Sequence, residues 1–97
     1  PQAATIKGFN ARLEARFHSP MSAFAGNAYD GFWMAAKAIE AAGSTDKAKV
    51  RDAIEATHNF LGMNGIFNMT PTDHNGIPAS SLRMVIVKNG TWAFAPK

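Results

Sequence analysis

The side chains best suited to chemistry in this sequence are three histidines, His18, His58 and His74. They are far apart in sequence, match no local metal-binding spacing, and have no cysteine to complete a site. His18 and His58 each follow a helix-like segment, where an exposed imidazole near the carboxyl end of the helix is common. His74 lies in the polar run Asp73-His74-Asn75-Gly76, which is typical of a turn but also of a loop that lines a cleft. We therefore expect no metal site.

The sequence also lacks the local patterns of a catalytic centre. A nucleophilic serine would need a Gly-x-Ser-x-Gly turn, and none is present. The segment Gly62-Met63-Asn64-Gly65 has neither the GxGxxG spacing nor the lysine of a phosphate-binding loop. The carboxylates lie mostly on the expected solvent faces of helices: Asp30, Glu40, Asp52, Glu55 and Asp73. We expect no catalytic residue, no cofactor and no enzyme activity.

Aromatic side chains are concentrated near the start of one apolar segment, as Phe24, Tyr29, Phe32 and Trp33. Core packing is the interpretation that we favour for Phe32 and Trp33. Phe24 and Asn27 lie in the first two helical turns, where unpaired backbone amides can meet a carboxylate or another polar group of a ligand. A binding role and a core role are equally compatible with Phe24.

Composition limits the class of protein. The chain has 97 residues, 46% of them hydrophobic, which suits one small globular unit. The net charge of +3 comes from scattered basic residues interleaved with acidic ones, so we expect no nucleic-acid partner. The absence of cysteine excludes disulfides. No run approaches the roughly 18 apolar residues of a membrane span, and the first residues do not resemble a secretion signal.

Hydrophobic periodicity predicts helices over about 5–17, 20–42 and 46–57. Ser19 or Ser22 is suited to begin the second helix and Gly43 to end it, and Ser44 or Thr45 to cap the third. Short strands are expected within 60–69, followed by a polar loop over 70–81. Strands at 82–87 and 91–95 flank Asn89-Gly90, a strong hairpin signal.

The predicted strands are too few to cover the apolar faces of the predicted helices in a separate domain. The second helix is apolar around most of its girth, which indicates cover on more than one side. The only substantial strands come last, after a long polar loop. We therefore expect this chain to be part of a larger protein, and alone to expose a large apolar patch that a second copy or the rest of the parent chain would cover.

A family resemblance rests on short motifs that occur in a fixed order. They are Pro20-x-x-Ala23-Phe24-x-x-x-Ala28-Tyr29-Asp30-Gly31, Ala38-Ile39-Glu40-x-Ala42-Gly43-Ser44, Val50-Arg51-Asp52-Ala53-Ile54, Phe60-x-Gly62-x-x-Gly65-x-Phe67 and Asp73-His74-x-Gly76. From about residue 6 to residue 94, the chain resembles the C-terminal portion of a branched-chain-amino-acid-type substrate-binding protein of an ABC transporter. The loop at 73–76 and the turn before Trp92 resemble the subset that takes aromatic or related carboxylates.

The resemblance implies an α/β fold, part of two lobes that close over a ligand. Residues 1–70 would be the last part of the N-terminal lobe, 71–81 a crossover between lobes, and 82–97 a terminal hairpin of the C-terminal lobe. The implied function is periplasmic binding of an amino acid or aromatic acid and its delivery to an ABC permease. The implied ligand-binding residues are Phe24, Asn27, Tyr29 and His74, although Tyr29 and Asp30 would be mainly structural and His74 would lie near the hinge.

Two other functions stay open at this point. A ligand-sensing domain of a receptor or regulator uses the same fold, and flanking sequence would distinguish it. An autonomous helical module that docks a partner through the apolar second helix is the other alternative.

Overall fold

The computed structural model describes residues 2–96 and begins with three helices. They are α1 (Gln2–Phe17), α2 (Ala23–Ala42) and α3 (Lys47–Glu55). Four short strands follow, β1 (Phe60–Leu61), β2 (Ile66–Phe67), β3 (Val85–Lys88) and β4 (Thr91–Phe94), with a 3₁₀ turn, η1 (Ala79–Ser81), between β2 and β3. The α/β order predicted from the sequence is confirmed, and the observed helix bounds differ from the predicted ones by at most three residues.

Local side chains explain these shifts. α1 ends at Phe17, because the next residue, His18, adopts a positive φ of 53°. The Ser22 hydroxyl accepts a hydrogen bond from the Ala25 amide at 3.2 Å, so α2 begins at residue 23 rather than at residue 20. Gly43, at φ 58°, ends α2 as predicted. The cap of α3 is Asp46, not Ser44 or Thr45: its carboxylate accepts from the Lys49 amide at 3.1 Å.

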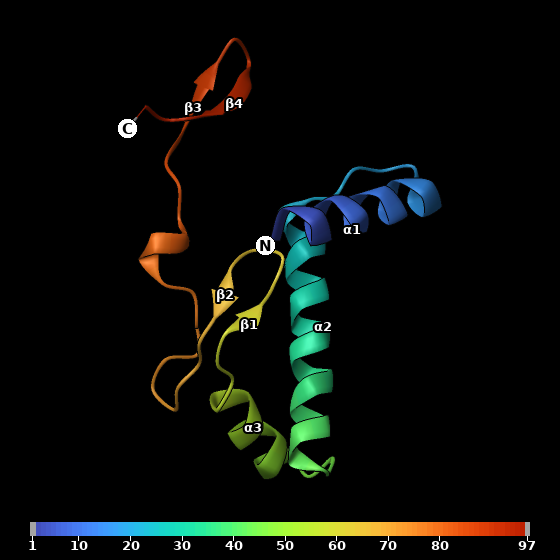
Figure 1. Ribbon diagram of the computed structural model, residues 1–97, viewed down its shortest axis with the longest axis vertical. Coiled ribbons are helices and arrows are strands. Elements are labelled where there is room, and N and C mark those ends of the chain that lie inside the picture. The colour runs from blue at the N-terminus through green and yellow to red at the C-terminus, as the bar shows by residue number, and fades with distance from the viewer. Residues whose placement is uncertain (1, 97) are drawn as a thin grey trace.

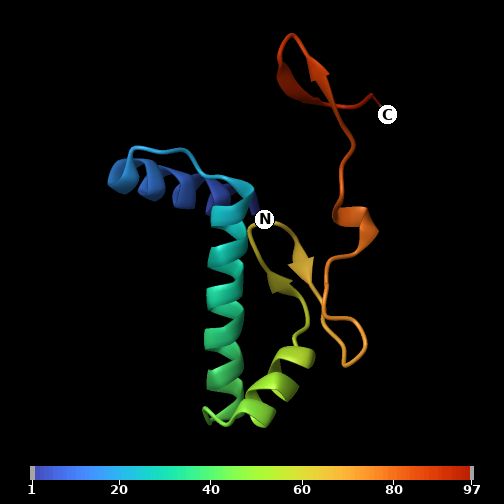
Figure 2. The ribbon, with the colours of Figure 1, turned by 180° about the vertical axis from the view of Figure 1, so that it is seen from behind.

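The helices meet at the two ends of α2. In both ribbon views α1 crosses the N-terminal end of α2 and α3 packs beside its C-terminal end (Figures 1 and 2). The rings of Phe9 and Tyr29, with centroids 4.8 Å apart, join α1 to α2. The long helix α2 is therefore the element on which the other two are arranged.

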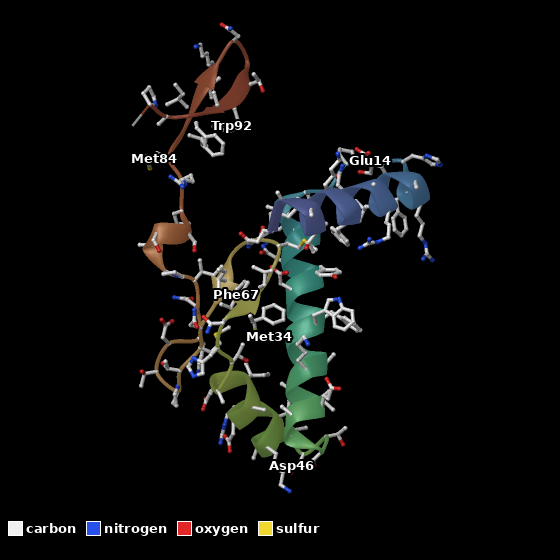
Figure 3. All side chains as sticks on the ribbon, viewed as in Figure 1. Glu14, Met34, Asp46, Phe67, Met84 and Trp92 are labelled. Atoms are coloured by element: carbon white, nitrogen blue, oxygen red, sulfur yellow. The ribbon has the colours of Figure 1, made fainter. Side chains whose placement is uncertain are left out.

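The β1–β2 hairpin lies along the same side of α2 as α3 (Figure 1). Phe60 pairs with Phe67 and Leu61 with Ile66, and the turn between the strands is closed by a hydrogen bond from the Gly62 amide to the Gly65 carbonyl at 2.9 Å. Met34 on α2 and Phe67 on β2 lie in the region between the helix and this hairpin (Figure 3). The brief strands expected within 60–69 are present.

The β3–β4 hairpin stands away from the helices (Figures 1 and 2). Its register runs from Val85 opposite Phe94 to Lys88 opposite Thr91. Asn89 and Gly90 have φ values of 52° and 75°, the left-handed pair that an Asn-Gly turn of type I′ requires. Ordered strand pairing begins at residue 85 rather than 82, and the expected 70–81 loop contains η1 and a bridge between Thr70 and Asp73.

The packing of this chain leaves much apolar surface open. Its radius of gyration is 16.0 Å, against about 12.5 Å for a compact chain of this length. Its accessible surface of 7503 Å² exceeds the value for a compact protein of this mass by about 2,100 Å². The sequence analysis favoured core packing for Phe32 and Trp33, but they are 68% and 42% exposed, so neither is a core residue within residues 2–96. The reason is that α3 and β1–β2 lie together along one side of α2.

No helix among residues 2–96 is long and apolar enough to cross a membrane.

Candidate functional site

Two of the four predicted ligand-binding residues lie side by side on the first turns of α2. Phe24 is 82% exposed, and Asn27, three residues further along the helix, is exposed beside it. Residues with this spacing lie on the same face of a helix. Ser22 satisfies one backbone amide at this helix end, that of Ala25. An aromatic ring and a carboxamide are therefore presented together at the start of α2.

Tyr29 lies apart from this pair and is half-buried. Its ring packs on Phe9 of α1 and lies 6.2 Å from the ring of Trp33, centroid to centroid. Tyr29 thus takes part in the packing between α1 and α2, and its predicted part in ligand binding stays a prediction.

His74 is also separate from Phe24 and Asn27. Its Nε2 lies 3.2 Å from the Glu55 carboxylate, at the end of α3. The Asp73 carboxylate accepts from the amides of Asn75 and Gly76, which makes the 73–76 segment a tight polar turn. The structure thus places His74 against the C-terminal end of α3, whereas Phe24 and Asn27 lie in the first turns of α2.

Asp30 is the residue that the sequence analysis misplaced. Helical periodicity placed it on a solvent face of the second helix, whereas the family resemblance gave it a mainly structural role, and it is 2% exposed. One carboxylate oxygen accepts from the Met63 amide at 2.6 Å and the other from the Asn64 amide at 3.1 Å. A buried carboxylate is stable only when it is hydrogen-bonded in this way. Asp30 therefore attaches the β1–β2 turn to α2.

Glycines make this attachment close. A Cβ atom on Gly62 would lie 2.7 Å from Asp30 Oδ2 and 2.6 Å from the Phe67 ring, distances that real side chains do not show. The Gly62 carbonyl accepts from the side-chain amide of Gln2 at 2.7 Å, which brings α1 into the same contact. Residues 62–65 are thus fixed against the N-terminal half of α2.

Asn64 extends this contact to the candidate site. Its side-chain amide donates to Oδ1 of Asn27 and lies 3.5 Å from the Ala23 carbonyl oxygen. Sequence reasoning did not select Asn64. The signal was present only as Gly-x-x-Gly spacing, which does not indicate the helix that the turn will meet.

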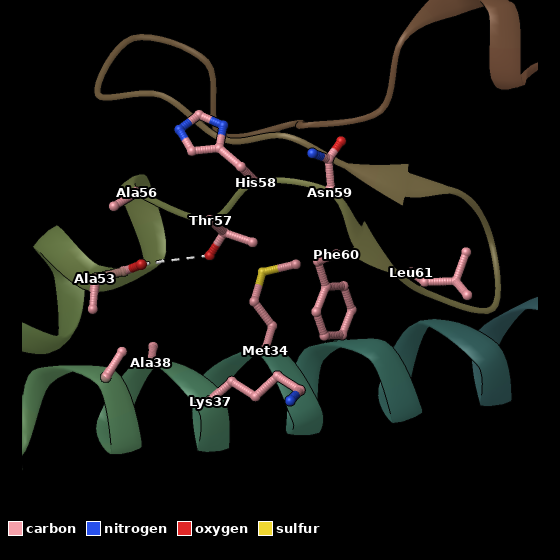
Figure 4. Close-up of a pocket in the computed structure, with 11 residues that line it drawn as sticks. Met34, Lys37, Ala38, Ala53, Ala56, Thr57, His58, Asn59, Phe60 and Leu61 are labelled. Atoms are coloured by element: carbon pink, nitrogen blue, oxygen red, sulfur yellow. Dashed lines mark hydrogen bonds between the residues drawn. The ribbon is translucent and has the colours of Figure 1, made fainter.

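A hollow of about 460 Å³ lies elsewhere, between α2, α3 and β1 (Figure 4). Small side chains from α2 and α3 line one part of it, and Met34, Phe60 and His58 another. The Thr57 hydroxyl donates to the Ala53 carbonyl at 3.5 Å at one end. None of the four predicted ligand-binding residues lines this hollow.

The charged groups on α3 include an exposed ion pair between Arg51 and Asp52. Arg51 donates to Asp52 at 2.5 Å on the exposed surface, and this hydrogen bond, with the charges of Asp52 and Glu55, raises the pKa of the arginine further above neutrality. Among residues 2–96, no three histidine, cysteine, aspartate or glutamate side chains are gathered as metal ligands would be.

Comparison with known proteins gives two matches. Residues 1–91 match the family described as periplasmic binding protein. Among solved structures, a leucine-binding protein from Thermotoga maritima is similar, with 30% sequence identity and a TM-score of 0.66. The match covers 94% of this chain and 25% of that protein, so the chain spans about a quarter of its length. No curated protein matches the sequence.

Proposed function

This chain belongs to the periplasmic binding protein family, and from that membership we propose that it forms part of the solute-binding component of an ABC importer. The proposed solute is an amino acid or an aromatic or other apolar carboxylate, held between two lobes and released to a membrane permease. The proposed location is the periplasm. Binding would proceed without chemical turnover.

The observation that carries this proposal is the exposed pair Phe24 and Asn27. They lie in a chain that matches a leucine-binding protein at 30% identity over 94% of this chain's own length. Phe24 is 82% exposed, so its ring offers apolar surface at the helix start that a ligand's side chain can cover. Ligand sites combine such apolar groups with a few polar groups that orient the ligand. We propose Phe24 as a contact for the ligand's side chain and Asn27 as a polar contact beside it.

The remaining predicted residues take supporting places in this proposal. Tyr29 stabilises the packing of α1 on α2 through Phe9. His74 belongs to the segment that leads toward the β3–β4 hairpin, and we propose residues 71–81 as the crossover between two lobes. What supports this is the distance between the hairpin and the helices (Figure 2). Lobes that move on a few connecting residues are the usual device for closing over a ligand.

The test is a ligand screen on the intact protein that carries this sequence. Thermal unfolding would be followed with leucine, the other amino acids, benzoate and phenylacetate. A ligand that binds only the folded protein raises the midpoint in proportion to the logarithm of its concentration. We expect at least one of these compounds to do so. If none shifts the midpoint at millimolar concentration, the proposed solute class is wrong.

A further inference from the structure

The orientation of the Asn27 carboxamide is fixed by its neighbours. The side-chain nitrogen of Asn64 faces the Ala23 carbonyl oxygen, 3.5 Å away, and also Oδ1 of Asn27. A backbone carbonyl can only accept, so the Asn64 atom that faces it must be the NH₂ group. The same NH₂ group then requires an acceptor on Asn27. The oxygen of Asn27 is thereby turned toward Asn64.

Asn64 itself has little freedom to move. Its backbone amide donates to Asp30 Oδ2 at 3.1 Å, and the neighbouring Met63 amide donates to Oδ1 of the same carboxylate. Its side-chain atoms lie so close to Gly26 that a Cβ atom there would approach them to 3.2 Å. The buried carboxylate of Asp30 and the absence of a side chain at Gly26 thus hold the Asn64 amide against the first turns of α2.

The consequence concerns the other side of the Asn27 carboxamide. With its oxygen engaged, Asn27 presents its NH₂ group, a donor of two hydrogens, on the exposed surface beside Phe24. Asp30, an acceptor on the same helix, is buried and already engaged by two amides. The pair Phe24 and Asn27 therefore offers an apolar ring next to a hydrogen-bond donor.

We infer that Asn64 is a positioning residue that determines specificity by holding the donor side of Asn27 toward the ligand. The preferred ligand then carries a hydrogen-bond acceptor, such as an ether, carbonyl or hydroxyl oxygen, in the part of its side chain that lies against Phe24. This inference rests on the proposed function. It adds the requirement that the ligand's side chain carry a hydrogen-bond acceptor, which contact with Phe24 alone would not impose.

The affinities of two nearly isosteric amino acids for the intact protein, measured by calorimetry, test whether the ligand's side chain needs this acceptor. O-methylserine has an ether oxygen where norvaline has a methylene group. One neutral hydrogen bond predicts that O-methylserine binds the wild type about three- to tenfold more tightly. In Asn27→Leu this preference should disappear. In Asn64→Asp the Asn27 amide can turn its NH₂ toward the new carboxylate, so the preference should disappear or reverse. Asn75→Asp, the same change of charge in the 73–76 turn, should keep it.

A second measurement needs no ligand. Asn27→Asp keeps an acceptor opposite the Asn64 NH₂ group, whereas Asn64→Asp places an acceptor against the Ala23 carbonyl oxygen, which cannot become a donor. Asn64→Asp should therefore melt at a lower temperature than Asn27→Asp. The reverse order of melting, or equal affinity of the wild type for the two probes, would overturn the inference. Failure of every amino acid and carboxylate to bind would refute the proposed function instead, and the melting order would still decide the amide orientation.

Discussion

At the scale of single residues, Phe24 and Asp30 contrast a proposed ligand contact with a structural residue. Both lie on α2 within two turns of each other, yet Phe24 is 82% exposed and Asp30 is 2% exposed. The open surface of Phe24 is the basis of its proposed contact with a ligand. Asp30 has its two oxygens occupied by backbone amides.

Replacing Phe24 by alanine should weaken ligand binding in the intact protein. A buried aromatic contact with the ligand's side chain is worth about 1–3 kcal/mol, which is at least a fivefold rise in Kd. Isothermal titration with whichever compound the screen identifies would measure it. Phe32→Ala is the matched control, since Phe32 is also exposed on α2 but two turns further on. An unchanged Kd for Phe24→Ala would remove this residue from the site.

Replacing Asp30 by asparagine should destabilise the fold. The change turns one of two engaged oxygens into an NH₂ group that faces a backbone donor, and a hydrogen bond to a charged group contributes about 1.5–3 kcal/mol. We expect the free energy of unfolding of the intact protein, measured in urea, to fall by about 2–4 kcal/mol. Glu40→Gln, an exposed change on the same helix, should cost less than about 0.5 kcal/mol. Equal values for the two variants would contradict the role given to Asp30.

The sequence was informative about residues whose behaviour is set locally. Gly43 and the Asn89-Gly90 pair have the left-handed backbone that their types favour, and both were identified in advance. Asp30 and Asn64 were misjudged or missed because their partners are more than 30 residues away along the chain. Helical periodicity treats a carboxylate as solvent-seeking and carries no information about which turn will dock on it.

At the scale of elements, the β3–β4 hairpin depends on its turn. Apart from residues 89–91 themselves, no atoms lie within 4 Å of a Cβ atom built on Gly90, so the rest of the structure leaves room for a side chain there. Its φ of 75° is unfavourable for a β-branched residue. Gly90→Val should therefore destabilise the hairpin by about 1–2 kcal/mol through backbone conformation alone.

Cross-strand contacts between Val85 and Phe94, followed by NMR, would report that loss. Gly90→Asn is the control, because asparagine tolerates the left-handed region and should keep most of the pairing. If the valine and asparagine variants gave equal hairpin populations, the turn would not control the register.

At the scale of the whole molecule, the accessible surface area is larger than that of a compact protein of the same mass. The excess of about 2,100 Å² over a compact protein is similar to the total surface buried in a standard protein interface. Large apolar side chains on α2 and the β3–β4 hairpin are exposed, among them Phe32, Trp33, Trp92 and Phe94.

The 97-residue chain produced by itself should therefore bind a hydrophobic dye, melt without a sharp transition and associate at micromolar concentration. Sedimentation and dye fluorescence would measure these properties. The same residues within a longer polypeptide that supplies the rest of the family fold should lose dye binding. A compact monomer that melts cooperatively and binds no dye would contradict this expectation.

The contact between Gly62 and Asp30 restricts how related sequences can vary. Any side chain at position 62 would occupy the space that the Asp30 carboxylate and the Phe67 ring now fill. A shorter residue at position 30 would free that space but leave the Met63 and Asn64 amides without their acceptor. Substitutions at 30 and 62 should consequently be found together in homologues, or not at all. Even at 30% identity, where most surface positions have diverged, this pair should have remained aspartate and glycine or have changed as a unit.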